Sequence, residues 1–159
     1  MNAHLVAIPG AVAAMSITDQ RPMLGCTVLT FLAVAPERRG RGLGTTLLSA
    51  VIERFRASGT GHWLFVEAQQ RPARLYRRCG FRRLAMDYHV PHYGADAGCE
   101  AMSLMALPRA ADDAARVDGA LVAAMVRDAF IDGYGLDPGD GRLAAQLTRI
   151  PASVELEGC

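Results

Sequence analysis

The sequence predicts a single α/β domain, in which helices flank a mixed β-sheet. The chain has 159 residues, about half of them hydrophobic, and this suits one domain with a substantial core. In its first half, a strand pattern is followed by a helix pattern and a second strand pattern. Two strands joined in this way are expected to be parallel, with a right-handed crossover.

Each element of that unit follows from its apolar spacing. Residues 4–18 are expected to form a β-hairpin, because a Pro-Gly turn separates two apolar stretches. Residues 27–34 are apolar on both faces, which favours a central strand covered on both sides. Apolar residues recur every four positions over residues 42–57, which predicts an amphipathic helix. A compact strand is expected at residues 62–67.

The rest of the chain continues this alternation. A second helix is expected to begin at Pro72, since proline is favoured at the first helical position. Strands are predicted at residues 81–90 and 101–107. The broad apolar face of residues 111–131 predicts a helix, although Gly119 weakens it by about 1 kcal/mol relative to Ala.

The composition excludes several classes of protein. No apolar run reaches the roughly 18 residues that a membrane span needs. The N-terminus lacks a basic stretch followed by an apolar one, so we expect no secretory signal and a cytoplasmic protein. The cysteines form no CxxC pair, which argues against a zinc site or a disulfide framework, and no metal is expected. They are Cys26, Cys79, Cys99 and Cys159.

The charges are unevenly distributed along the chain. Residues 21–83 contain twelve Arg and three Glu, whereas residues 84–159 contain five Arg and twelve Asp or Glu. A basic half suggests a polyanionic ligand. The alternative is that the two halves complement each other's charge within one fold.

The sharpest local feature is a loop rich in glycine between the strand at 27–34 and the helix at 42–57. It reads Arg38-Arg39-Gly40-Arg41-Gly42-Leu43-Gly44. A strand-to-helix turn aims backbone N–H groups at one point, at the positive end of the helix dipole, and glycines let a phosphate approach closely. The loop lacks the GK[ST] of a P-loop and the GxGxxG of a dinucleotide site. A purely structural turn is the alternative.

A second motif supports a ligand at this loop. Thirty-two residues after Gly44 comes Tyr76, within Ala73-Arg74-Leu75-Tyr76 and before Gly80-Phe81. Together with the spacing Arg39-x-x-Gly42-x-Gly44, this motif resembles the signatures of the GNAT superfamily of acetyl-CoA-dependent N-acetyltransferases. The resemblance covers roughly residues 4–107. It implies a GNAT-like mixed, splayed β-sheet flanked by helices, with acetyl-CoA as the acyl donor.

The resemblance also implies which residues bind the cofactor. The backbone of Leu32, Ala33 and Val34 would pair with the pantetheine arm as an added strand does. Gln69 stands where the family usually has asparagine, and would contact the pantetheine from a longer side chain. The backbone of the loop would hold the pyrophosphate, and Arg39 and Arg41 would either pair with phosphate or remain solvated. The loop residues assigned to the cofactor are Arg39, Gly40, Arg41, Gly42, Leu43, Gly44 and Thr45.

Two catalytic residues are implied in the same way. Tyr76 matches the family's tyrosine near the sulfur and is expected to be the general acid, a role typically contributing roughly 10²–10⁴-fold. Glu67 ends the second splayed strand, where burial would raise its pKa and suit it to act as general base. The alternatives are a core tyrosine, an ion pair between Glu67 and an arginine, and proton removal by His89, His92 or water.

The front of the family pattern is missing. The family usually opens with a strand and two helices, whereas this chain begins almost directly in the hairpin. Residues 1–108 are therefore expected to form the catalytic core, and residues 109–159 a helical segment that completes the same domain. Helices at 111–131 and 142–149 would cover the open sheet face, within the chain or in a homodimer that exchanges this segment. An ordinary helical tail is the alternative.

The expected function is transfer of an acetyl or other acyl group from acetyl-CoA to a primary amine of a small molecule or protein. A non-catalytic acyl-CoA-binding regulatory module is the alternative, and it would keep the loop without needing Tyr76. A third hypothesis is nucleic-acid binding by the Arg-rich residues 71–83. No aromatic stacking platform accompanies these arginines, so no nucleic-acid partner is expected.

Overall fold

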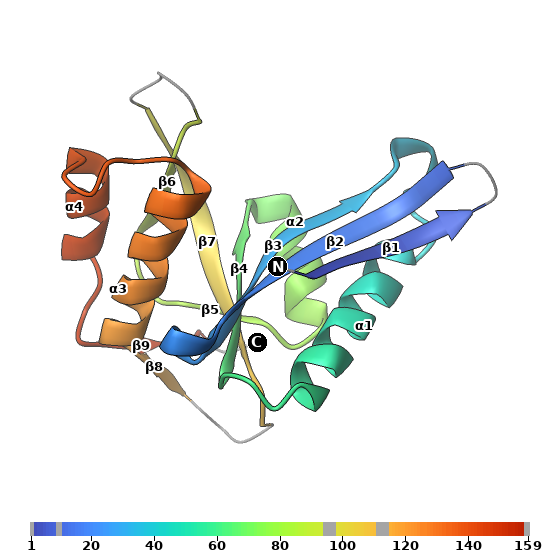
Figure 1. The fold of residues 1–159 in the computed structure, drawn as a ribbon, viewed down its shortest axis with the longest axis horizontal. Helices are drawn as coiled ribbons and strands as arrows, with labels where there is room; N and C mark the ends of the chain where they lie inside the picture. The colour runs from blue at the N-terminus through green and yellow to red at the C-terminus, as the bar shows by residue number, and fades with distance from the viewer. Residues whose placement is uncertain (1, 9–10, 94–97, 111–114, 158–159) are drawn as a thin grey trace.

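The computed structural model describes residues 2–8, 11–93, 98–110 and 115–157. Figure 1 shows a central twisted β-sheet with helices on both of its faces, as the sequence predicts. None of the helices within these ranges is long and apolar enough to cross a lipid bilayer.

The first three strands form an antiparallel meander. Strand β1 (Asn2–Ile8) pairs with β2 (Ala11–Arg21), which confirms the predicted hairpin. A 3₁₀ turn, η1 (Pro22–Leu24), then leads into β3 (Cys26–Val34). Strand β3 pairs with β2 from end to end, with one irregularity in the register. The predicted turn at residues 9–10 lies outside the described ranges.

The predicted strand–helix–strand unit follows. Helix α1 (Leu43–Ala57) comes after β3, and strand β4 (Trp63–Ala68) returns parallel to β3. The apolar face of α1 packs on the sheet, because five of its side chains are buried and four of them belong to the core between this helix and the sheet. The five are Leu47, Leu48, Val51, Ile52 and Phe55.

Helix α2 (Gln70–Arg78) begins two residues earlier than predicted. Pro72 therefore stands within the first turn rather than at its start, where its missing N–H costs no helical hydrogen bond. Strand β7 (Cys99–Pro108) runs antiparallel to β4 and covers the strand predicted at residues 101–107.

The single strand predicted over residues 81–90 is wrong. Two short strands stand there, β5 (Arg82–Arg83) and β6 (Tyr88–Pro91), and they pair with different parts of β7. Between them the Leu84 N–H still donates to the Leu104 carbonyl of β7, while Leu84 and Ala85 also pair with residues 155–156. Apolar spacing does not reveal this second partner, because both partners are extended backbone.

The C-terminal segment adds two helices and a small sheet. Strand β8 (Arg116–Asp118) leads into α3 (Gly119–Asp128), and a π-helical turn, η3 (Ala129–Gly133), extends this helix. Helix α4 (Gly141–Thr148) confirms the predicted final helix. Strand β9 (Ser153–Glu155) then pairs with β8.

Helix α3 begins later than the helix predicted over residues 111–131. Residues 111–114 lie outside the described ranges, and Asp118 caps the helix by accepting a backbone N–H of the first turn. Gly119 has a packing role, because a Cβ there would lie 1.9 Å from the carbonyl oxygen of Pro151. The residue that weakens the helix by propensity thus allows α3 to approach the backbone before β9.

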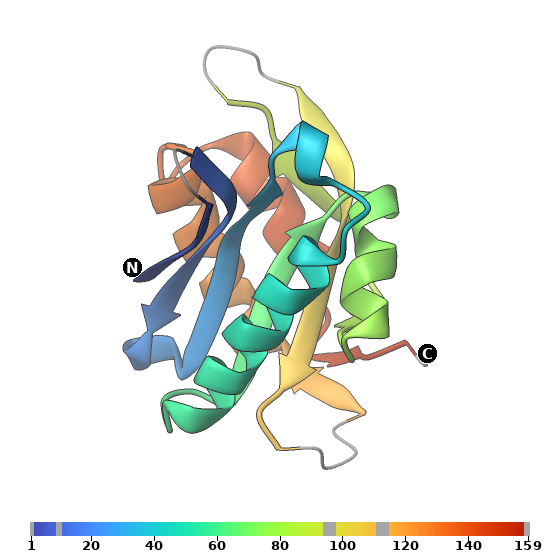
Figure 2. The same ribbon diagram turned by 90° about the vertical axis from the view of Figure 1, so that its right-hand side faces the viewer.

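The sheet separates two hydrophobic cores. Its strands follow the order β1-β2-β3-β4-β7-β5, with β6 on β7. Figure 2 shows α1 and α2 in front of the sheet and the C-terminal helices behind it. Leu64 and Val66 of β4 point into the core under α1 and α2, whereas Phe65 packs with Val122 and Phe130 on the other face. Both faces around β4 are therefore covered by helices of the same chain.

Candidate functional site

The glycine loop has a backbone that demands glycine. Gly40 and Gly42 have φ angles of 76° and 80°, in the left-handed region that side chains disfavour. Gly42 is the N-cap of α1, and no side chain caps this helix. The first helical hydrogen bond across the cap runs from the Thr46 N–H to the Gly42 carbonyl. The N–H groups of the first turn before Thr46 are thus available to an anion.

A groove of about 410 Å³ lies beside this loop. Three arginines line it, Arg38 and Arg39 from the loop and Arg78 from α2. The Arg39 Nε donates to the Val34 carbonyl at 3.2 Å, which ties the loop to the end of β3. Positive charge, free N–H groups and a concave surface together suit a diphosphate.

The two parallel strands separate as they approach the groove. Strands β3 and β4 pair only from Cys26 with Trp63 to Leu29 with Val66, although β3 continues to Val34. The last residues of β3 pair with β2 on their other edge. The edge of β3 that faces β4 is therefore open over Leu32, Ala33 and Val34, except at the Val34 carbonyl, which accepts from the Arg39 Nε. An extended amide chain can pair with such an edge.

Glu67 lies near the end of β4 and is half-buried. The Tyr134 hydroxyl donates to its Oε2 at 2.7 Å, and the Tyr88 hydroxyl donates to its Oε1. Burial raises the pKa of the Glu67 carboxyl, and the two tyrosine hydrogen bonds partly offset this rise. The ion pair with an arginine, considered from the sequence, is not among the contacts of Glu67 in the described residues.

Tyr76 lies on α2 and packs into the core under α1 and α2. Its ring makes an edge contact with Phe81 at 5.6 Å between centroids, and burial raises the pKa of its phenol to about 12. Among the described residues, none hydrogen-bonds to its hydroxyl. Leu75 and Arg78 of the same helix line the groove, whereas Tyr76 does not. The phenol is protonated at neutral pH, as a proton donor requires, but its raised pKa makes it a weaker acid than an exposed tyrosine.

The remaining predicted residues are placed as follows. Gly42, Leu43, Gly44 and Thr45 line the groove together with Gly40, whereas Arg41 is exposed and does not line it. Gln69 is exposed and donates to Glu100 Oε1 at 2.9 Å. His89, considered as a proton relay, has its Nδ1 at 2.8 Å from Arg149 Nη1.

Sequence reasoning missed several residues of these two regions. Arg38 and Arg78 line the groove, but an arginine-rich chain offers no signal that distinguishes them from other arginines. Tyr88 and Tyr134 hold Glu67, and both are far from it in the sequence. Tyr134 falls in a Gly-rich stretch that predicts only a turn. No pattern in the sequence pairs these tyrosines with Glu67.

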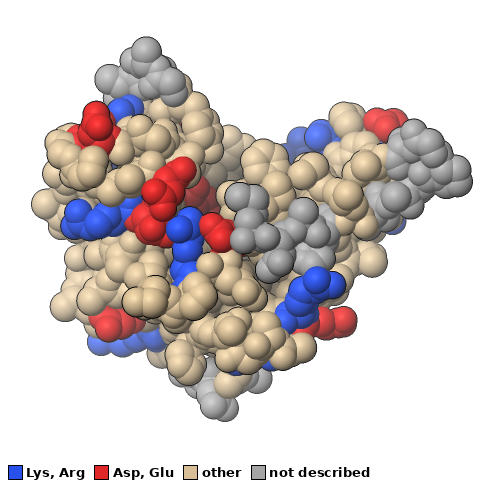
Figure 3. All heavy atoms as spheres, viewed as in Figure 1, with Lys and Arg blue, Asp and Glu red and all other residues tan. Residues whose placement is uncertain are grey.

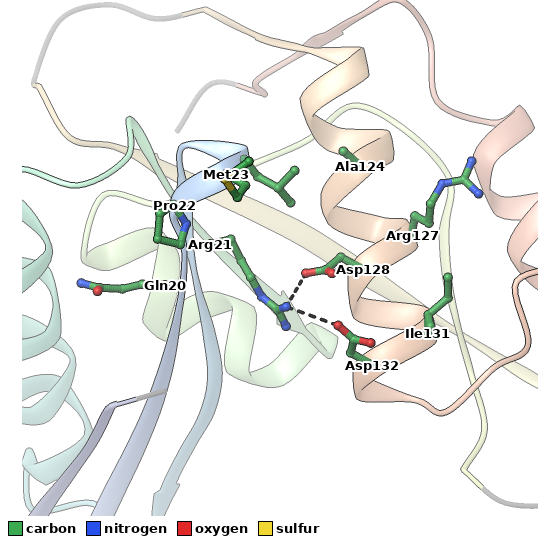
Figure 4. Close-up of a pocket in the computed structure, with 10 residues that line it drawn as sticks. Gln20, Arg21, Pro22, Met23, Ala124, Arg127, Asp128, Ile131 and Asp132 are labelled. Atoms are coloured by element: carbon green, nitrogen blue, oxygen red, sulfur yellow. Dashed lines mark hydrogen bonds and ion pairs between the residues drawn. The ribbon is translucent and has the colours of Figure 1, made fainter.

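A second cavity, of about 580 Å³, lies between η1 and α3. Figure 4 shows Arg21 reaching toward Asp128 and Asp132, at 2.6 and 3.5 Å, and Asp19 also pairs with it at 2.9 Å. Figure 3 shows acidic side chains around a basic one near the middle of this face. None of the residues predicted for the site lines this cavity. Within the described ranges, no group of His, Cys, Asp and Glu could hold a metal ion.

Comparison with known proteins supports the resemblance. Residues 4–81 match the profile of the Acetyltransferase (GNAT) family. A mycothiol acetyltransferase of Clavibacter michiganensis is 47% identical over 58 residues, which make up 35% of this chain and 19% of that protein. The chain thus matches about a fifth of the length of this curated relative.

Solved structures share the fold. The ribosomal-protein-S18-alanine N-acetyltransferase of Escherichia coli aligns with a TM-score of 0.56 and 26% identity, over 70% of this chain and 72% of that one. A Bacillus subtilis acetyltransferase in complex with CoA aligns with a TM-score of 0.53 and 20% identity, over 67% of this chain and 75% of that one. This likeness concerns the fold alone. The profile match includes the glycine loop and Tyr76, and the splayed sheet agrees with these structures. This chain therefore belongs to the GNAT acetyltransferase family.

Proposed function

We propose that this protein is an N-acetyltransferase that moves an acetyl group from acetyl-CoA to a primary amine of a small molecule or protein. The observation that carries the proposal is the gap between β3 and β4, which opens beside a groove lined by the glycine loop and three arginines. This arrangement supports a donor with an extended amide arm and a diphosphate. Family membership and the acetyltransferase relatives support the same activity.

The residues present fit acetyl-CoA. The N–H groups at the start of α1 would hold the diphosphate, with Arg38, Arg39 and Arg78 as countercharges. The open edge of β3 over residues 32–34 would pair with the amides of the pantetheine arm. Gln69 would need to leave Glu100 to reach the arm, so its contribution would be smaller.

The chemistry assigned to the chain moves two protons. The acceptor nitrogen forms a bond to the acetyl carbon, and the bond from that carbon to sulfur breaks. Glu67 takes a proton from the nitrogen and Tyr76 gives one to the departing sulfur, and proton exchange with solvent then restores both side chains. In total, the amine loses one proton and gains the acetyl group, and coenzyme A leaves as the thiol. Holding both reactants in one site removes much of the entropic cost of their encounter.

The pKa direction of Glu67 suits its role, whereas the raised pKa of Tyr76 makes its phenol a weaker acid than an ordinary tyrosine. Burial raises the pKa of Glu67, which makes its carboxylate a stronger base than an ordinary glutamate. Burial raises the pKa of Tyr76 to about 12, and the phenol is protonated when sulfur departs, as a phenol with an ordinary pKa would also be. The acceptor amine, before it is deprotonated, would be a cation that faces Glu67, Tyr88 and Tyr134.

We further propose that residues 109–159 take the place of the opening helices that the family usually has. The support is that α3 and α4 pack on the sheet face opposite α1 and α2. On this reading the segment acts within its own chain, and a homodimer that exchanges it is a second possibility. A cytoplasmic enzyme, with acetyl-CoA as its donor, is part of the same proposal.

The proposal is tested by thiol release from acetyl-CoA in the presence of a panel of primary amines and amino-terminal peptides. Release that depends on an amine, and a large loss in Glu67→Gln, are expected. The non-catalytic alternative predicts coenzyme A binding by calorimetry without release for any amine. Folded protein that neither binds coenzyme A nor releases thiol would rule out both.

A further inference from the structure

Two tyrosine hydroxyls converge on the carboxylate of Glu67. Tyr88 of β6 donates to Oε1, and Tyr134, which follows η3, donates to Oε2 at 2.7 Å. Each oxygen thus has its own donor and keeps lone pairs for a further proton. Neither tyrosine lies within the residues 4–81 that match the family.

The π-helical turn η3 determines where Tyr134 lies. The Tyr134 N–H bonds to the Ala129 carbonyl at 3.1 Å, which is the wider spacing of a π turn. Gly135 follows with a φ of 72°, and reverses the chain directly after the tyrosine. Single π turns inside helices are frequent at functional sites. Together, η3 and Gly135 end the helical segment so that the side chain of Tyr134 points toward Glu67 of β4.

A buried phenylalanine fixes both tyrosine rings. Phe130 is fully buried and lies 6.2 Å from the ring of Tyr88 and 5.7 Å from that of Tyr134, between centroids. The rings therefore have little freedom to leave Glu67. Tyr93 stacks on the outer side of Tyr134 at 4.8 Å and is 71% exposed.

The titratable groups around Glu67 come from β6, from the residues just after it, from β7 and from the turn after η3. Tyr88 on β6 and Tyr134 after η3 contact it directly, and both hydrogen bonds lower its pKa against the rise caused by burial. The charges of Glu100 on β7 and of Tyr93 raise the pKa of Tyr134. Burial and the nearby Glu67 carboxyl raise the pKa of Tyr88 and of Tyr134, so both remain donors at neutral pH.

We infer that Tyr88 and Tyr134 are positioning residues that hold the two oxygens of the Glu67 carboxylate, so that the C-terminal segment completes the active site. This inference rests on the proposed function, in which Glu67 is the general base. A segment that only covers the sheet would need the apolar residues of α3, but it would not need a hydroxyl at residue 134.

The direct test is the titration of Glu67 in protein labelled with ¹³C at glutamate carboxyls. The chain has six glutamates, and Glu67→Gln assigns the signal. Removing either hydroxyl, by Tyr134→Phe or Tyr88→Phe, is expected to raise the pKa of Glu67. Tyr93→Phe is the control, because it removes a nearby phenol that makes no hydrogen bond to Glu67. Unchanged titration of Glu67 in both Tyr134→Phe and Tyr88→Phe would overturn the inference.

Kinetics provide the second readout. Tyr134→Phe should lower kcat by roughly ten- to a hundredfold, as expected for loss of a hydrogen bond to a charged group, and leave the KM for acetyl-CoA unchanged. The acid limb of its kcat/KM profile should move to higher pH, while Tyr93→Phe keeps the wild-type profile. If wild-type protein releases no thiol with any amine, the proposed function fails, while the titration still decides whether the tyrosines hold Glu67. A wild-type profile in Tyr134→Phe contradicts the inference alone.

Discussion

Replacing Gly42 with alanine tests the loop without introducing a clash. A Cβ at this position would have no heavy atom within 4 Å, so the cost is conformational. Alanine at a φ of 80° is disfavoured by about 1–2 kcal/mol. The strain can be relieved if the backbone rotates, but rotation turns the N–H groups at the start of α1 away from the groove. Affinity for coenzyme A is therefore expected to fall by about tenfold, which is roughly 1.4 kcal/mol.

Gly59 offers a matched control at the other end of α1. It also has a positive φ, of 67°, and open space around its Cβ position, but it does not line the groove. Gly42→Ala and Gly59→Ala should lower the Tm by a similar amount, roughly 2–8 °C for a domain of this size. Calorimetric titration with coenzyme A should separate them, because only Gly42→Ala weakens binding. Equal affinities in the two variants would refute the argument that the loop backbone holds the diphosphate.

Three further substitutions test other parts of the account. Tyr76→Phe should lower kcat by roughly 10²–10⁴-fold with little change in the KM for acetyl-CoA, and an unchanged kcat in thiol release would exclude a general acid at this residue. Arg21→Ala should lower the Tm by about 2–4 °C, because it removes partly exposed ion pairs to α3 worth about 1 kcal/mol, and the difference should shrink in high salt. Gly119→Ala should lower the free energy of unfolding by about 1–3 kcal/mol, because the new Cβ clashes with the Pro151 carbonyl. The control Gly139→Ala, whose Cβ would meet nothing within 4 Å, should not lower it. Equal denaturation midpoints for the two variants would contradict the packing role of Gly119.

The sequence predicted the elements whose pattern is local. The apolar spacing of α1 and the two-sided apolar character of β3 are properties of single segments, so both strands and the helix of the parallel unit were predictable. The start of α3 was misplaced, because residues 116–118 pair as β8 with residues 153–155, which lie far away in the sequence. The division of residues 81–90 depends on pairing with residues 155–156, which no local pattern encodes.

The same distinction holds for the candidate site. The glycine loop and Tyr76 stand in motifs whose spacing is fixed by one turn and one helix. The surroundings of Glu67 are assembled from β4, β6 and the turn after α3, so Tyr88 and Tyr134 became visible only in the folded chain. Burial of Glu67 was expected from its place at a strand end, but its hydrogen-bond partners were not.

The most direct test of the central claim is a titration of ¹⁵N-labelled protein with coenzyme A, followed by amide chemical shifts. The account predicts the largest changes at residues 42–45, which line the groove, and along the β3 edge at residues 32–34, which faces the gap to β4. Residues 124–132 beside the second cavity should change little. Folded protein without shifts at the loop and the β3 edge, or with shifts confined to residues 124–132, would contradict it.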